Sequence, residues 1–208
     1  MKKNIYKGKF FAFEGLDGSG QTTQANLLKN HLEKMKFKVV LTKEPTNDSN
    51  AGKLVNKILN QNKKLTGNEL KKLQKKFSED RKWHQENRIK PALKKGKIVI
   101  TDRSQFSSFA FGTASGIDLN YLLKINEKFI EPCLVILLKV SPKVCIKRIQ
   151  KRGTKETLFE KEKQLEKVWM VFEKLAKKFN NIVIIDGEKS IEEISENIKK
   201  IVKKRLSI

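Results

Sequence analysis

The sequence predicts an α/β fold in which a parallel sheet of about five strands lies between two layers of helices. Three observations support this: short β-rich apolar runs recur along the chain, segments of helical length separate them, and a glycine-rich turn joins the first run to the first helix. Alternation of this kind indicates a parallel sheet covered by helices. With 208 residues, of which 38% are hydrophobic, residues 1–208 are expected to form a single domain.

The expected strands are short runs of apolar residues. They are expected at residues 9–14, 37–42, 97–101, 133–140 and 182–185. The expected helices are longer stretches in which apolar residues recur at helical spacing between charged residues. They are expected at residues 22–35, 67–94, 156–179 and 190–204.

The strongly basic composition raises the question of a nucleic-acid partner. The formal net charge is +23, and phosphate contacts from Lys and Arg dominate the affinity of proteins for nucleic acids. However, only six of the 46 basic residues are arginines, and the lysines are spread over nearly every segment rather than clustered with aromatic residues. We therefore expect no nucleic-acid partner. Arginine provides a planar fork that lysine lacks, so the few arginines are expected where bidentate contacts matter.

The sequence also bears on membranes and on redox state. No apolar run approaches the roughly 18 to 20 residues that cross a membrane, and the first apolar run reaches Glu14 too early to be a secretory signal. Cys133 and Cys145 have no His or Cys partner at metal-ligand spacing, so both are expected to be reduced residues of the core. These features predict a cytoplasmic protein with no membrane partner.

A glycine-rich loop lies between the first expected strand and the first expected helix, which is the position of a P-loop. Its glycines allow the backbone to point successive N–H groups at phosphate oxygens, and the helix that follows adds the positive end of its dipole. A chance glycine-rich turn is the alternative, but the flanking strand and helix favour the motif and a three-layer P-loop NTPase fold. The residues expected to bind ATP are Gly15, Leu16, Asp17, Gly18, Ser19, Gly20, Gln21, Thr22 and Thr23.

One residue departs from the P-loop pattern G-x-x-x-x-G-K-[ST], because Gln21 stands in the place of the lysine. Its amide can donate hydrogen bonds, but a positive charge beside the β- and γ-phosphates is missing. Either the activity is lower or another cation compensates. Lys139 is a candidate because it ends an expected strand, and strand ends line the nucleotide crevice of such sheets. A lysine that merely reaches solvent at a strand end is the alternative.

Asp102 and Arg103 directly follow another expected strand, and so should lie at the same edge of the sheet as the glycine-rich loop. We expect Thr22 and Asp102 to hold Mg²⁺, the first through its hydroxyl and the second directly or through water. Arg103 can clamp a substrate phosphate in a bidentate manner. A plain ion pair between Asp102 and Arg103 is the alternative.

Several motifs together resemble those of the thymidylate kinases, which are P-loop nucleoside monophosphate kinases. They are EGLDGSGQTTQ, TKEPT, FSEDRKWHQENRIKPAL, TDRSQFSS and RIQKRG, in the order and spacing of that family, and the resemblance runs from about residue 10 to residue 173. It implies direct in-line transfer of a phosphoryl group from ATP, with Mg²⁺, to dTMP. It also implies a homodimer.

The resemblance assigns roles to the residues of these motifs. It implies that Asp17 contacts the sugar and phosphate region of dTMP and that Arg103 grips the dTMP phosphate. Phe77 would stack on thymine and Arg81 would bind a carbonyl of the base, and their spacing of four places both on one face of a helix. The remaining residues expected at the substrate are Glu44, Pro45 and Ser107.

The motif RIQKRG resembles the family's lid, expected here near residues 148–156. In the family the lid closes on ATP, and its arginines supply positive charge during transfer, which points to Arg148 and Arg152 as catalytic residues beside Asp17, Gln21 and Arg103. Some relatives carry an arginine in the place of Gly18, so its absence makes a donor from the lid more necessary. The number of lid contacts stays open, because a later arginine of the lid is replaced near Leu158.

Two departures bear on specificity. Ser104 stands where the family has Tyr or His, and Gly112 stands where it has glutamine. The aromatic residue crowds the 2′ position of the sugar, so the smaller Ser104 predicts weaker discrimination against ribose monophosphates such as UMP. Two alternatives stay open: a kinase of relaxed or different pyrimidine monophosphate specificity, and a nucleotide-binding regulator or basic nucleic-acid-binding protein without turnover.

Overall fold

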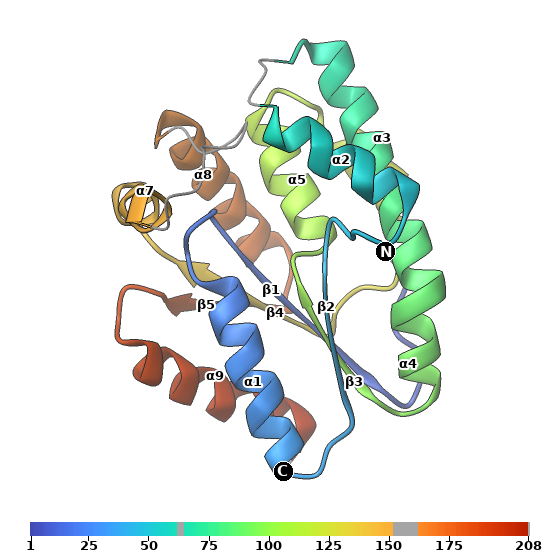
Figure 1. The fold of residues 1–208 in the computed structure, drawn as a ribbon, viewed down its shortest axis with the longest axis vertical. Helices are drawn as coiled ribbons and strands as arrows, with labels where there is room; N and C mark the ends of the chain where they lie inside the picture. The colour runs from blue at the N-terminus through green and yellow to red at the C-terminus, as the bar shows by residue number, and fades with distance from the viewer. Residues whose placement is uncertain (62–64, 152–161, 208) are drawn as a thin grey trace.

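The structure is a computed structural model, and it describes residues 1–61, 65–151 and 162–207. Five parallel strands form one sheet in the order β2-β3-β1-β4-β5 (Figure 1). The expected α/β architecture and the five-stranded parallel sheet are confirmed. The strands are β1 Lys9–Gly15, β2 Val39–Lys43, β3 Ile98–Asp102, β4 Leu134–Lys139 and β5 Ile182–Asp186.

Helices cover both faces of the sheet (Figure 1). On one face, α1 and α9 pack against alternate strand residues, among them Phe11 and Phe13. On the other face, α5 and α8 enclose a larger core that includes Ala12 and Leu137. The described helices are α1 Gln21–Lys34, α2 Asn50–Asn60, α3 Gly67–His84, η1 Gln85–Ile89, α4 Lys90–Lys94, α5 Gln105–Ala114, α6 Leu119–Asn126, α7 Pro142–Lys151, α8 Glu162–Lys178 and α9 Ile191–Leu206.

The expected helix at residues 67–94 is present as three consecutive segments. α3 begins with a capping box in which Thr66 and Glu69 bond each other's backbone N–H groups. It continues through the π-helical turn η1 into α4, which has Pro91 at its start. The expected helix at 190–204 is α9, which also starts with a capping box, and α8 corresponds to the expected helix at 156–179 from residue 162 onward.

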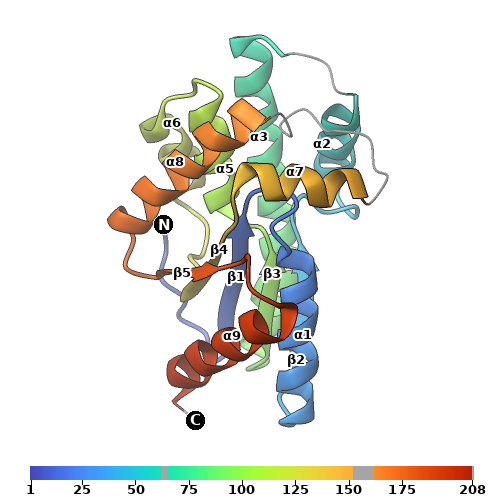
Figure 2. The same cartoon turned by 90° about the vertical axis from the view of Figure 1, so that its left-hand side faces the viewer.

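The sheet brings the carboxyl ends of its strands to one edge. Phe13 of β1 and Lys43 of β2 both pair with Asp102 of β3, and Gly15 pairs with Leu138 of β4. The loop after β1, the loop after β2 and the turn after β3 therefore open at the same edge, and α7 lies beyond it (Figure 2). This edge positions the glycine-rich loop, the loop with Glu44 and Pro45, and Asp102 with Arg103.

The structure also describes the state of the two cysteines and the character of the helices. Cys145 is buried and Cys133 is half-buried, and neither forms a disulfide. Burial raises the pKa of the Cys145 thiol to about 12, so it stays neutral. Across the described residues, no helix is both long enough and apolar enough to cross a membrane.

Candidate active site

The glycine-rich loop connects β1 to α1 and has the backbone geometry of a phosphate-binding loop. Gly15, Gly18 and Gly20 all have positive φ angles, of 153°, 85° and 99°. Gly18 is constrained twice, because a Cβ atom there would also lie only 2.6 Å from the carbonyl oxygen of Cys145 in α7. A larger residue at position 18 would push the loop away from α7.

A cleft of about 370 Å³ lies against this loop. Among the described residues, three cationic side chains line it: Arg148 and Lys151 from α7, and Lys189 from the segment between β5 and α9. Arg148 is held there by a 3.2 Å hydrogen bond from Nη2 to the carbonyl of Gly187. Of the residues expected to bind ATP, the cleft is lined by Gly18, Ser19, Gly20, Gln21, Thr22, Thr23 and Arg148.

The other residues expected at ATP have different positions. The side chain of Leu16 is fully buried in the core beside α5 and α8, so only its backbone faces the loop. Asp17 lines the second cavity described below rather than this cleft. Arg152 lies outside the described residues, as do Lys155, Glu156 and Leu158 of the expected lid.

Gln21 bonds back to the first residue of the loop. Its side chain is buried, and Nε2 donates a 3.0 Å hydrogen bond to the carbonyl of Gly15. The amide therefore supplies a donor where the P-loop pattern has lysine, but no charge. Lys139 is exposed and is not among the described residues lining the cleft, whose cations are Arg148, Lys151 and Lys189.

The two residues expected at Mg²⁺ are in contact. Thr22, in the first turn of α1, donates a 2.5 Å hydrogen bond from Oγ1 to Oδ2 of Asp102 at the end of β3. A hydroxyl and a carboxylate are the oxygen ligands that Mg²⁺ takes beside water and phosphate. The oxygens of these two residues therefore fit a Mg²⁺ ion, with Thr22 in the lining of the cleft and Asp102 outside that lining.

Arg103 is held between the loop and α5. Its backbone lies in the left-handed region, with φ of 72°, and its N–H donates to the carbonyl of Phe13. Nη1 donates to the carbonyl of Gly15 at 3.0 Å and to Oγ of Ser107 at 2.9 Å, while Nη2 pairs with Asp17. Burial acts to lower the pKa of Arg103, but the nearby carboxylates, Asp17 first among them, raise it, so the guanidinium is charged.

Glu14 is a buried carboxyl group beneath this arginine. It accepts hydrogen bonds from the backbone N–H of Ser104 at 2.8 Å and from the hydroxyls of Ser104 and Ser107 at 2.7 and 2.6 Å. Burial raises the pKa of Glu14 to about 7, against the opposing effects of Arg103 and of these hydrogen bonds. The hydroxyl of Ser104 thus donates a hydrogen bond to Glu14. Ser104 is small and places no aromatic ring at this position.

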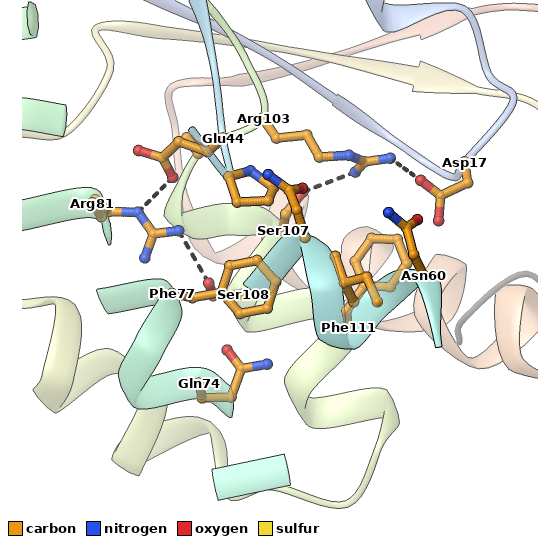
Figure 3. A pocket seen from close by; sticks show the side chains of 14 residues that line it. Asp17, Glu44, Asn60, Gln74, Phe77, Arg81, Arg103, Ser107, Ser108 and Phe111 are labelled. Atoms are coloured by element: carbon orange, nitrogen blue, oxygen red, sulfur yellow. Dashed lines mark hydrogen bonds and ion pairs between the residues drawn. The ribbon is translucent and has the colours of Figure 1, made fainter. Parts of the chain in front are cut away.

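A second cavity, of about 250 Å³, lies on the other side of Asp17 (Figure 3). All seven residues expected at the substrate line it, although they come from separate segments of the chain. Ser104, expected to affect specificity, lines it too. The lining residues are Asp17, Glu44, Pro45, Asn56, Leu59, Asn60, Gln74, Phe77, Arg81, Arg103, Ser104, Ser107, Ser108 and Phe111.

Arg81 is fixed inside this cavity by three partners. Nε donates to Oε2 of Glu44 at 2.8 Å, Nη2 donates to Oγ of Ser108 at 3.1 Å, and Nη1 donates to Asn126. The other oxygen of Glu44 contacts Nδ1 of His84 at 3.0 Å. Burial acts to raise the pKa of Glu44, but the charges and hydrogen bonds of Arg81 and His84 together outweigh it and lower the pKa, so Glu44 is ionised and orients Arg81.

The loop that carries Glu44 and Pro45 is anchored to α3. The peptide bond between Glu44 and Pro45 is cis. Directly after it, the buried carboxylate of Asp80 accepts hydrogen bonds from the backbone and hydroxyl of Thr46 at 2.8 and 2.6 Å and from the hydroxyl of Ser49 at 2.6 Å. The motif FSEDR therefore contributes both cavity residues and the anchor of the neighbouring loop.

Sequence reasoning missed several residues of this site, and five of them hold Arg81 or the loop with Glu44 in place or line the cavity beside Phe77. Ser108, Asn126 and His84 position Arg81 directly or through Glu44, Asp80 anchors the loop, and Gln74 lines the cavity. For three of them a signal existed, because Gln74, Asp80 and His84 lie on the helix that carries Phe77 and Arg81. Asn126 had none, since it comes from α6, 45 residues from Arg81 in sequence.

Comparison with known proteins agrees with this geometry. A family model described as thymidylate kinase matches residues 13–198. A probable thymidylate kinase of Pyrococcus horikoshii is 41% identical over 203 residues, covering 96% of this chain and 98% of the relative. The probable thymidylate kinase of Archaeoglobus fulgidus is 37% identical over 198 residues (95% and 96% covered), and the thymidylate kinase of Caldicellulosiruptor saccharolyticus is 31% identical over 201 residues (94% and 96%). The chain therefore belongs to the thymidylate kinase family.

Proposed function

We propose that this protein transfers the γ-phosphoryl group of ATP to dTMP, forming dTDP and ADP. The observation that carries the proposal is the position of Arg103. It contacts the carbonyl of Gly15 in the phosphate-binding loop and, at the same time, lines the cavity that contains Phe77 and Arg81. A phosphate of a nucleotide in that cavity would thus lie next to the phosphates of a nucleotide on the loop.

The loop and α7 bind ATP in this proposal. Backbone N–H groups of residues 15–23 and the N-terminus of α1 hold the phosphates, and Arg148, Lys151 and Lys189 add positive charge along the cleft. Thr22 and Asp102 hold Mg²⁺, which would neutralise charge on the transferred group. Arg152 is proposed to act beside Arg148 from the lid.

The second cavity binds dTMP. Phe77 provides an aromatic face for the base, and Arg81, fixed by Glu44 and Ser108, provides donors for a base carbonyl. Pro45 lies beside the sugar. At the phosphate, Arg103 exchanges part of its pairing with Asp17 for the substrate, so that Asp17 is free to contact the sugar and phosphate region.

Catalysis needs no covalent intermediate in this arrangement. Phosphoryl transfer depends on bringing the acceptor oxygen into line and on neutralising charge in the transition state. Arg103 and the cations of the cleft do this here, and the amide of Gln21 contributes a neutral donor. We further propose that the chain acts as a single domain, from its length and composition, that it works in the cytoplasm, and, from the family resemblance alone, that it assembles as a homodimer.

A substrate panel tests the proposal. The purified protein is incubated with ATP, Mg²⁺ and each of dTMP, dUMP, UMP, CMP and AMP, and ADP release is followed in a coupled assay. A strong preference for dTMP is expected. Measurable dTMP binding without turnover would instead support a nucleotide-binding regulator, and a preference for another monophosphate would reassign the substrate.

A further inference from the structure

Gln74 is a buried cavity residue with an unmet hydrogen-bonding group. It lies on α3, three residues before Phe77, and its side chain belongs to the lining of the second cavity (Figure 3). Gln74 is only 2% exposed, and its amide oxygen Oε1 has no hydrogen-bond partner in the described part of the chain. Most buried polar groups are paired, so an unpaired one in a cavity wall calls for an explanation, and a ligand of that cavity can supply the missing partner.

Gln85 provides a comparison for Gln74 within the same helical run. Gln85 follows in the same helical run and is equally buried. Its Nε2 donates to the carbonyl of Ile130 at 3.1 Å, and its Oε1 accepts from the N–H of Ile130 at 2.9 Å. Gln85 is not among the residues that line the cavity. Gln85, away from the cavity, thus has both ends of its amide bonded, whereas Oε1 is unpaired in Gln74 at the cavity and in Gln24 at the cleft.

The position of Gln74 depends on Gly112 of α5. A Cβ atom built on Gly112 would lie 3.3 Å from Cδ of Gln74 and 2.8 Å from Cδ1 of Leu122. Any side chain at position 112 would therefore compete with the amide of Gln74 for the same space. Gly112 leaves that space free, and the amide of Gln74 occupies it beside the cavity.

The helix presents three complementary groups to one ligand. Gln74, Phe77 and Arg81 lie at positions i, i+3 and i+7 of α3, which places them on one face. Phe77 offers a flat apolar surface, Arg81 offers only donors, and Gln74 offers an acceptor next to a donor. The imide edge of thymine or uracil presents a carbonyl, an N–H and a second carbonyl, which these groups match.

We propose that Gln74 is a specificity-determining residue that accepts a hydrogen bond from N3–H of the pyrimidine base through Oε1. Rotation about the bond between Cγ and Cδ turns this oxygen toward the cavity, because that torsion is soft. The amide Nε2 then donates to the neighbouring carbonyl. The base of CMP is a 4-aminopyrimidine, which has no N3–H to donate to Gln74. Its amino group would face Arg81, and because both groups are donors they cannot bond each other. The site should therefore exclude CMP. This inference rests on the proposed dTMP site and extends it.

The test combines one protein variant with one substrate analogue. Gln74→Met keeps the length of the side chain and removes its hydrogen-bonding groups, and N3-methyl-dTMP removes the donor from the base. Binding of both ligands to both proteins is measured by titration calorimetry. The wild type should bind dTMP about 10- to 100-fold more tightly than N3-methyl-dTMP, because the analogue leaves Gln74 unpaired. Gln74→Met should bind dTMP about tenfold less tightly and should discriminate between the two ligands by less than about threefold.

Thermal unfolding without ligand separates this role from a structural one. Gln74→Met removes an unpaired buried group, so its melting temperature should be unchanged or higher. The matched control Gln85→Met breaks two hydrogen bonds to Ile130 and should lower the melting temperature. If Gln74→Met binds dTMP as the wild type does and keeps the wild-type discrimination, Gln74 does not contact the base and the inference is overturned. If the wild type binds no dTMP, the proposed function itself fails, and the inference fails with it.

Discussion

Arg103 pairs with Asp17 at the boundary between the two cavities, with 2.5 Å between Nη2 and Oδ1. Asp17 comes from the phosphate-binding loop and Arg103 from the turn after β3, so the pair joins the ends of two neighbouring strands. Neither side chain is fully buried, at 18% and 26% exposure, and both line the second cavity. The pair can therefore open toward a phosphate without unpacking the core.

Replacement of Arg103 should abolish most of the activity. Arg103→Lys keeps the charge but loses the planar fork that contacts Gly15 and Ser107. We expect kcat with dTMP to fall by about 10²- to 10³-fold, as for loss of a group that stabilises the transition state. Arg88→Lys is the control, since Arg88 forms an exposed ion pair with Asp48 outside both cavities and should leave kcat unchanged.

Substitution of two lysines tests which cation contributes to ATP binding. Lys189 lines the cleft at the phosphate-binding loop, whereas Lys139 is exposed and does not. Lys189→Ala should raise the KM for ATP about three- to tenfold, because a partly solvated charge contributes modestly to binding. Lys139→Ala should leave it unchanged. The reverse pattern in steady-state kinetics would restore Lys139 as the compensating cation.

Gln21→Lys should increase kcat while decreasing stability. A lysine adds a positive charge at the β- and γ-phosphates, where electrostatic stabilisation provides most of the catalysis, and about a tenfold gain is expected. Without nucleotide the charge is buried beside Gly15, so the melting temperature should fall. Kinetics and thermal unfolding of this single variant check both parts, and an unchanged kcat would mean that the neutral amide already suffices.

The discrimination between deoxyribose and ribose should be weak. Ser104 lines the cavity with its hydroxyl bonded to Glu14, and it supplies no ring that could crowd a 2′-hydroxyl. The clean comparison is dUMP with UMP, because they differ only at the 2′ position. We expect their kcat/KM values to differ by less than about tenfold. A preference for dUMP above a hundredfold would show that another residue excludes the ribose.

Glu14 should make the stability of the protein depend on pH. Burial raises its pKa from 4.5 to about 7 in the folded state, so this group favours folding fully below pH 4.5 and loses that contribution as the pH rises to about 7. The loss amounts to about 3 kcal/mol. Glu14→Gln removes it, so between pH 5 and pH 7.5 the free energy of unfolding in urea should fall further for the wild type than for the variant. Parallel pH curves for the two proteins would contradict the buried, protonated state.

The sequence predicted those features that depend on local patterns. The loop pattern places Thr22 at the start of α1, and the strand pattern places Asp102 at the end of β3, so a parallel sheet brings both to one edge, and the pairing of β1 with β3 brings them into contact. Phe77 and Arg81 share a helix face because they are four residues apart. The bounds of the strands differ from the expected ones by at most two residues, because the ends of β runs carry weak signals.

Features that depend on packing between distant segments could not be predicted. The contact between Glu44 and His84 joins residues 40 positions apart, and nothing in either motif indicates it. Lys139 ends a strand as expected, but it continues the alternation of Val135 and Leu137, whose side chains pack in the layer of α5 and α8 rather than in that of α1. The face of the sheet on which the last residue of a strand lies depends on the register of that strand in the sheet.

Direct detection of product is the decisive measurement. The protein is incubated with γ-³²P-labelled ATP, Mg²⁺ and dTMP, and the nucleotides are separated, with Arg103→Lys as a parallel sample. The account predicts that the label moves from ATP to dTDP in the wild type and that the rate falls sharply in the variant. Release of the label as inorganic phosphate, or no transfer despite bound dTMP, would contradict it.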